Sequence, residues 1–240
     1  MRQLKADFHC HVKIMGHGSF RPGQLKSRLE WARRFGLDLL AITEHIDIPD
    51  FWDITAFLED LCDQRRGVLR WRELVVITGA EVNIAEGGHI LLIGGSAALR
   101  QLEARLGRLD ANNPPLLKEL LDASENLGFL RIGAHPCRRR QDLWKMGPLL
   151  KRLDALEING RELSTAGWVT RQAGMLNIPV VTGSDAHHWL QMGRVYNLLP
   201  LDGDPGVAAI KDVVANHGVT WRVTGGLSHC KSLLKGAVTI

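Results

Sequence analysis

The chain has 240 residues, of which 45% are hydrophobic and 23% charged, with a formal net charge of +4. This suits one domain over residues 1–240 that buries its own core, and the charge is too small to indicate nucleic-acid binding by itself. No apolar run approaches the roughly 20 residues that a membrane-spanning helix needs. The N-terminus lacks the apolar stretch of a signal peptide, so we expect a cytoplasmic protein.

Short apolar runs recur along the chain, each bounded by polar residues or glycine. Runs of this kind predict buried, mostly parallel strands. They follow a first, more polar strand that ends near His11, and they cover residues 37–42, 74–77, 89–93, 129–134, 155–158 and 178–181.

Helical patterns lie between these runs, with apolar residues at helical spacing over residues 25–35, 116–127, 169–176 and 207–214. Three of the four are closed by a glycine, a common helix end: Gly36, Gly128 and Gly218. Repeated alternation of strand and helix favours an α/β protein, built as a barrel or as a doubly wound sheet.

The four cysteines are not spaced as metal-binding or redox pairs. They stand far apart, at Cys10, Cys62, Cys137 and Cys230. We expect reduced thiols, which argues against a zinc ribbon and against a disulfide scaffold.

Metal-type side chains follow the predicted strands. His9 and His11 share one face of the first strand, because alternate residues of a strand point the same way. Further candidates stand at the ends of later strands: His45, Glu81, His135, Asp185 and His187. In a β/α barrel such strand ends converge on one face, so the pattern predicts a site for several metal ions.

Two more histidines are ambiguous from spacing alone. His17 lies between Gly16 and Gly18, and His89 follows Gly87 and Gly88. Either could be a ligand or a residue of an exposed turn.

Five motifs, taken in order, resemble the PHP (polymerase and histidinol phosphatase) family, and in particular its stand-alone metal-dependent phosphoesterases. They are Asp-x-His-x-His from Asp7, Thr-Glu-His ending at His45, Gly-x-Glu ending at Glu81, Ala-His-Pro around His135, and Gly-Ser-Asp-x-His ending at His187. Glu44 departs from the aspartate of many members, and we expect it to point away from the metals.

The resemblance implies a distorted (β/α)7 TIM-like barrel with three divalent transition metal ions, for which zinc, manganese and iron all suit the ligands. Its ligand sets, carried over residue by residue, are His9, His11, Glu81 and Asp185 for one metal, Glu81, His89 and His135 for the second, and His17, His45 and His187 for the third. It thereby makes His17 and His89 ligands.

The resemblance also implies hydrolysis of a small phosphate monoester, such as a sugar, nucleotide or histidinol-phosphate-like compound, by a metal-activated hydroxide. Glu81 and Asp185 would form part of the catalytic centre. Asp7 would act behind the ligands or as a proton relay, although a structural cap is an equal alternative.

Other polar residues stand near the same barrel face. Arg138, Arg139 and Arg140 follow His135 and could bind substrate phosphate or form a solvated surface. Glu157 and Asn159 could orient ligands or lie on the rim.

Three other functions remain open on the sequence. A nuclease or nucleotide phosphodiesterase could use the same metals, which makes nucleic acid a possible but less favoured partner. An amidohydrolase-type amidase or deaminase also opens with an HxH pair, but it typically uses a lysine ligand in mid-barrel. A regulatory protein with an inactive site is disfavoured because every ligand position is filled. The sequence leaves the oligomeric state open.

Overall fold

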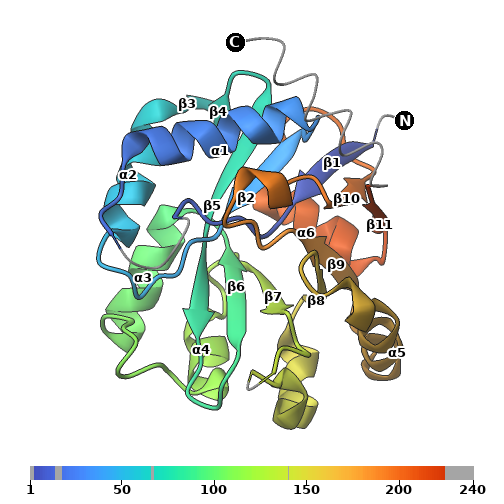
Figure 1. The fold of residues 1–240 in the computed structure, drawn as a ribbon. Coiled ribbons are helices and arrows are strands. Elements are labelled where there is room, and N and C mark those ends of the chain that lie inside the picture. The colour runs from blue at the N-terminus through green and yellow to red at the C-terminus, as the bar shows by residue number, and fades with distance from the viewer. Residues whose placement is uncertain (1–2, 14–17, 66–67, 140, 225–240) are drawn as a thin grey trace.

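The computed structural model describes residues 3–13, 18–65, 68–139 and 141–224. Its strands form one sheet in the order β11-β10-β1-β2-β5-β6-β7-β8-β9, which curls into a nearly closed barrel with helices outside it (Figure 1). The TIM-like α/β barrel expected from the sequence is thus confirmed. His17 and Arg140 lie outside the described residues, so their roles stay predictions, as does a single domain over residues 1–240.

The barrel path uses nine strands. They are β1 (Leu4–Asp7), β2 (Leu39–Ile42), β5 (Leu74–Asn83), β6 (His89–Ile93), β7 (Leu130–Ala134), β8 (Ala155–Asn159), β9 (Val180–Gly183), β10 (Val195–Leu199) and β11 (Thr220–Val223). A hairpin of β3 (Asp63–Arg65) and β4 (Val68–Trp71) extends the sheet beside β5. The hairpin, β10 and β11 were not anticipated from the sequence.

The outer helices are α1 (Pro22–Arg34), α2 (Phe51–Leu61), α3 (Ser96–Leu106), α4 (Leu117–Ser124), α5 (Ala166–Leu176) and α6 (Val207–Ala215). Of these, α2 and α3 were not predicted. Within the described part of the chain, no helix combines the length and the apolar character needed to cross a membrane.

The two faces of β2 show how the barrel holds its helices. Leu39 and Ala41 belong to the cluster that fills the barrel, whereas Leu40 and Ile42 belong to the cluster that includes α1 and α2. All four side chains are 3% exposed or less. A strand buried on both faces must be apolar throughout, which is why this run was readable from the sequence.

Strand direction differs from the mostly parallel expectation at β6 and β10. The strands β1, β2 and β5 run parallel, as do β7, β8 and β9. In contrast, β6 is antiparallel to both β5 and β7, and β10 is antiparallel to β1. The turn between β5 and β6 is too short for a crossover helix, so the chain reverses. His89, at the start of β6, therefore pairs with Asn83 and Ala134 at the ends of the neighbouring strands.

The barrel is closed in part by one side chain. Asn197 of β10 is fully buried, and its Oδ1 accepts a hydrogen bond of 2.8 Å from the backbone N–H of Thr182 on β9. Its Nδ2 donates to the carbonyl oxygens of Thr182 and Ala6, at 2.7 and 3.2 Å. The amide thus replaces a missing backbone partner between β9 and β1.

We predict that Asn197→Ala lowers the free energy of unfolding by about 3 kcal/mol or more, because it leaves buried backbone groups without partners. Urea unfolding at a fixed metal concentration measures the change. Asn216→Ala is the control, since Asn216 is exposed and its side chain, within the described part of the chain, donates to its own helix, so its change should stay within about 0.5 kcal/mol. A loss below about 1 kcal/mol for Asn197→Ala would contradict the closing role.

Candidate metal centre

His9 and His11 follow β1 in an extended segment, and both side chains are fully buried. The Nδ1 atom of His9 lies 2.8 Å from Glu157, and that of His11 lies 3.0 Å from Glu44. A carboxylate partner keeps the proton on Nδ1, so the lone pair of Nε2 is free for a cation. The two Nε2 atoms are 3.1 Å apart and face the same space.

Glu81 is the centre of the site, and it is only 2% exposed. Its Oε1 lies 2.6 Å from Nδ1 of His89 and 2.9 Å from Nε2 of His135. Its Oε2 lies 3.2 to 3.4 Å from the Nε2 atoms of three further imidazoles, those of His9, His11 and His45. One carboxylate thus contacts five of the predicted ligands.

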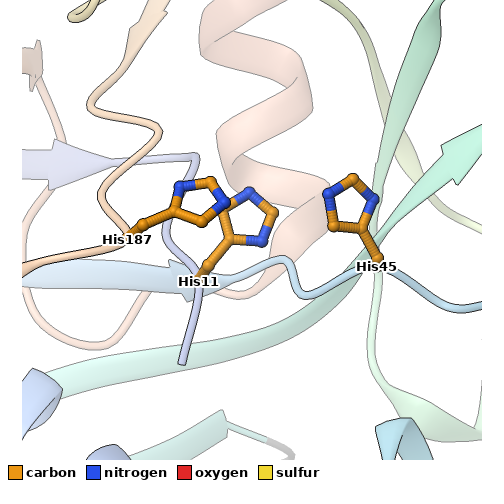
Figure 2. Close-up of side chains that lie close together, drawn as sticks. All are labelled: His11, His45 and His187. Carbon is orange, nitrogen blue, oxygen red and sulfur yellow. The ribbon is translucent and has the colours of Figure 1, made fainter. Parts of the chain in front are cut away.

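Asp185 and His187 complete the cluster from the segment after β9. Oδ1 of Asp185 lies 3.4 Å from Nε2 of His11. The ring centroid of His11 is 4.1 Å from that of His187 and 4.9 Å from that of His45. Figure 2 shows these three rings, each reaching the site from a different part of the barrel. The structure therefore brings together every predicted ligand except His17, which lies outside the described residues.

Two of the ligand candidates have positive φ angles, which non-glycine residues adopt at a cost. The angle is 29° for His135 and 50° for Asp185. Such strain persists where the surrounding structure fixes the backbone, and it is frequent at functional sites. Here it turns both side chains inward at the ends of β7 and β9.

The spacing of the donor atoms fits one metal ion. Five separations join the Nε2 atoms of His9 and His11 with each other and with the nearest oxygens of Glu81 and Asp185, and they span 3.1 to 3.8 Å. In a tetrahedral zinc site with ligands at about 2.0–2.1 Å, neighbouring ligand atoms are about 3.4 Å apart. The atoms of His9, His11 and Asp185 can therefore share one cation, and Glu81 lies beside both imidazoles.

The buried carboxylates of the site favour positive charge among them. Burial would lower the pKa of His9, but the charges of Glu157, Glu81 and Asp185 outweigh burial and raise it to about 10. Burial would likewise raise the pKa of Glu81, yet the imidazoles, beginning with His9, hold it well below its usual range. Either protons on the imidazoles or bound metal cations can supply this positive charge. Only a metal cation can bind the lone pairs of several imidazoles at once, and these lone pairs point into the site.

His187 and His45 favour the neutral form of the imidazole. Burial, followed by the charge of His11, lowers the pKa of His187 to about 4. Burial also lowers the pKa of His45. Neutral imidazole is the form that binds metal, so these two ligands need not lose a proton at neutral pH.

The geometric groups agree in part with the sets implied by the family resemblance. Four groups of side chains could each hold an ion: His9, His11 and Asp185; His9, Glu81 and His135; His45, Glu81 and His89; and His11, His45 and His187. The first matches three members of the first implied set. The last matches the third implied set, with His11 where the resemblance placed His17.

Asp7 lies behind the ligands, fully buried. Its Oδ1 accepts hydrogen bonds from the backbone N–H groups of Ser184 and His9, at 2.9 and 3.2 Å. Burial raises the pKa of its carboxyl to about 6. These contacts favour positioning of the two ligand segments, and a part in catalysis stays a prediction.

The arginine cluster reaches the site through Arg138, whose Nη2 donates to Oδ2 of Asp185 at 2.6 Å and whose Nε donates to Glu162 at 2.6 Å. Arg139 is exposed and makes no described contact with the ligands. Arg161, which the sequence did not single out, lies 3.5 Å from both Oδ2 of Asp185 and Nδ1 of His187.

The carboxylates behind the ligands are the main residues that sequence reasoning undervalued. Glu157, for which the sequence left open orienting a ligand or lying on the rim, contacts His9 and also accepts from the backbone N–H of His135 at 2.8 Å. Glu44 points away from the centre as expected, but it holds Nδ1 of His11 and accepts from the backbone N–H groups of Val12 and Lys13. The signal for Glu44 was its place beside His45, and that for Glu157 was its place near the end of a predicted strand.

The glycine of the last motif has a steric reason. A Cβ atom at Gly183 would lie 2.2 Å from Oε1 of Glu157 and 2.3 Å from the Cβ atom of His9. Any side chain there would displace the pair that orients the first ligand.

Comparison with known proteins supports the same family. Residues 170–215 match the family model described as PHP-associated. No curated protein matches the sequence significantly. The PHP-associated match, together with the fold, confirms the resemblance to the PHP family.

Several solved structures share the fold. PsfC from Pseudomonas syringae is 21% identical with a TM-score of 0.78, over 100% of both chains. The lesion-specific endonuclease from Pyrococcus furiosus is 20% identical with a TM-score of 0.68, over 93% of this chain and 57% of that one. A two-domain protein from Bacteroides vulgatus that contains a predicted PHP-like metal-dependent phosphoesterase is 18% identical with a TM-score of 0.63, over 97% of this chain and 69% of that one. At these identities the likeness shows the fold.

We predict that Glu157→Gln weakens metal binding by roughly ten- to a hundredfold, because His9 loses the charged partner that fixes its tautomer. Competition with a chelator measures the affinity. Glu30→Gln is the control, since the partners of Glu30 among the described residues are arginines away from the site, and its metal affinity should not change. Equal affinity in Glu157→Gln and the unchanged protein would refute the role of Glu157.

Proposed function

We propose that this PHP-type chain is a divalent-metal-dependent phosphoesterase that hydrolyses a phosphate monoester of a small molecule. The observation that carries the proposal is the Glu81 carboxylate, whose two oxygens face five imidazoles at 2.6 to 3.4 Å. A buried cluster of this composition suits several cations held close together. We further propose three ions, held by the residues of the implied sets.

The donor set narrows the choice of metal. It mixes imidazole with carboxylate, which suits zinc, manganese and iron. Cys10 lies between two ligands, but its Sγ faces the carbonyl oxygens of His11 and Ala186, at 3.7 and 3.9 Å, so thiolate ligation finds no support. When bound, the cations would lower the pKa of a water nucleophile and neutralise charge on the phosphate oxygens.

Arg161 is the best placed of the arginines to bind substrate. Both ends of the Arg138 guanidinium are already engaged, by Asp185 and by Glu162. Arg161 is 43% exposed, and its contacts with Asp185 and His187 are long, at 3.5 Å. An exposed guanidinium beside a metal cluster is complementary to the extra negative charge of a monoester dianion. Arg138 would then hold Asp185 in place beside it.

A nuclease is the second candidate. It is supported by the shared fold with the lesion-specific endonuclease and permitted by the net charge of +4. The amidohydrolase alternative finds less support, because the carboxylate of Glu81 occupies the centre of the site in place of a lysine ligand.

We predict that protein loaded with Zn²⁺, Mn²⁺ or Fe²⁺ releases phosphate from small monoesters with kcat/KM at least about tenfold above that for diesters. A panel of monoesters, diesters, lesion-containing duplex DNA and amides tests this. Faster cleavage of the duplex would support the nuclease instead. Absence of phosphoester hydrolysis with all three metals would refute the proposal.

Arg161→Met tests whether the guanidinium of Arg161 binds the substrate. It removes a charge-assisted contact and should raise KM for the monoester roughly tenfold or more, while metal content stays unchanged. Arg171→Met, on the exposed face of α5, is the matched variant and should leave KM as it is.

A further inference from the structure

One buried guanidinium ties together two ligand segments from behind. Arg28 of α1 is 4% exposed. Its Nε donates to the carbonyl oxygen of His11 at 2.8 Å, and its Nη2 donates to the carbonyl oxygen of His187. These two residues are 176 positions apart in the chain and lie in the segments after β1 and β9. The guanidinium therefore joins two segments that also pair directly, through the hydrogen bond of 3.0 Å that the backbone N–H of His11 donates to the carbonyl oxygen of Ala186.

Burying the charge of Arg28 costs desolvation free energy. Among the described residues, no carboxylate lies within ion-pair distance of Arg28, and its described acceptors are carbonyl oxygens. An apolar side chain at this position would avoid the cost of desolvating a cation. A rigid fork with two divergent donors gives in return a fixed distance between two carbonyl groups, which a lysine cannot give.

The rings carried by these two residues stack on each other. The centroids of His11 and His187 are 4.1 Å apart, with an interplanar angle of 29°. Together with His45 they form a group that could hold an ion. A small shift of either backbone would change the distance between the two ring nitrogens and hence the geometry offered to a cation.

Further contacts of α1 hold the segment after β9, which carries His187. Trp31, one turn along the helix from Arg28, stacks on Trp189 at 4.4 Å with an interplanar angle of 16°. The side chain of Gln191 accepts from the backbone N–H groups of His187 and His188, at 2.8 and 3.0 Å. The segment that carries His187 is thus held from α1 and from within itself.

We propose that Arg28 is a positioning residue that sets the spacing of His11 and His187, and thereby controls whether the group of His11, His45 and His187 binds its cation. The inference rests on the proposed metal centre. It implies that the two groups that contain Glu81 keep their ions when Arg28 is replaced.

The test compares Arg28→Lys with Arg33→Lys, a matched change on the exposed side of the same helix. Both proteins are titrated with Co²⁺, and metal content and visible spectrum are recorded, with His187→Ala as the reference for a lost outer ion. Arg28→Lys should bind its last ion roughly ten- to a hundredfold more weakly, with the spectrum of His187→Ala, while the tighter ions stay. Arg33→Lys should match the unchanged protein.

The outcomes separate this inference from the proposed function. If Arg28→Lys binds every Co²⁺ ion with unchanged affinity and spectrum, the positioning role is wrong, whatever the substrate. If the unchanged protein binds no metal, the metal centre itself is wrong. Arg28→Gln, which removes the buried charge, serves the same comparison should the lysine variant fail to fold by circular dichroism, and the same two results decide it.

Discussion

The arrangement of the whole site depends on the buried carboxylate of Glu81. Burial alone would favour its neutral form, and only the surrounding imidazoles keep its pKa low. Five imidazole nitrogens lie within 3.4 Å of its two oxygens. A buried polar cluster of this kind is unfavourable unless cations bind between its donor atoms. The carboxylate and the imidazoles are therefore best understood together, as the two halves of one cation-binding centre. Behind the imidazoles, Glu44 holds His11 and Glu157 holds His9 through the same pairing of carboxylate with imidazole.

The fold delivers these residues to one place by two different routes. Parallel strands bring their ends to one face of the barrel, which places the segments after β1, β2, β7 and β9 side by side. The reversal at β6 brings the start of a strand to that same face, so His89 joins from the opposite chain direction. A support of buried polar contacts, from Asp7, Arg28 and Gln191, then fixes the backbone behind the ligands.

The parts of this arrangement that follow from local pattern were predictable. The strand of residues 39–42 is apolar on both faces, and the ligands stand in compact motifs at strand ends. Long-range pairings were not predictable, because nothing local marks Glu157 as the partner of His9 or Arg161 as a neighbour of Asp185. The helix α2 was missed although Phe51, Ile54 and Leu58 have helical spacing and are buried. The direction of β6 depends on a short turn, whereas the expectation of parallel strands came from the short apolar runs.

The most direct test of the central claim is the anomalous difference density of crystals grown with saturating Mn²⁺ or Zn²⁺. We expect ions on both oxygens of Glu81, at about 2.0 to 2.2 Å. One ion should also contact His9, His11 and Asp185, and another should contact His89 and His135. Crystals at saturating metal that show no anomalous peak in contact with Glu81 would contradict its place at the centre of a metal site.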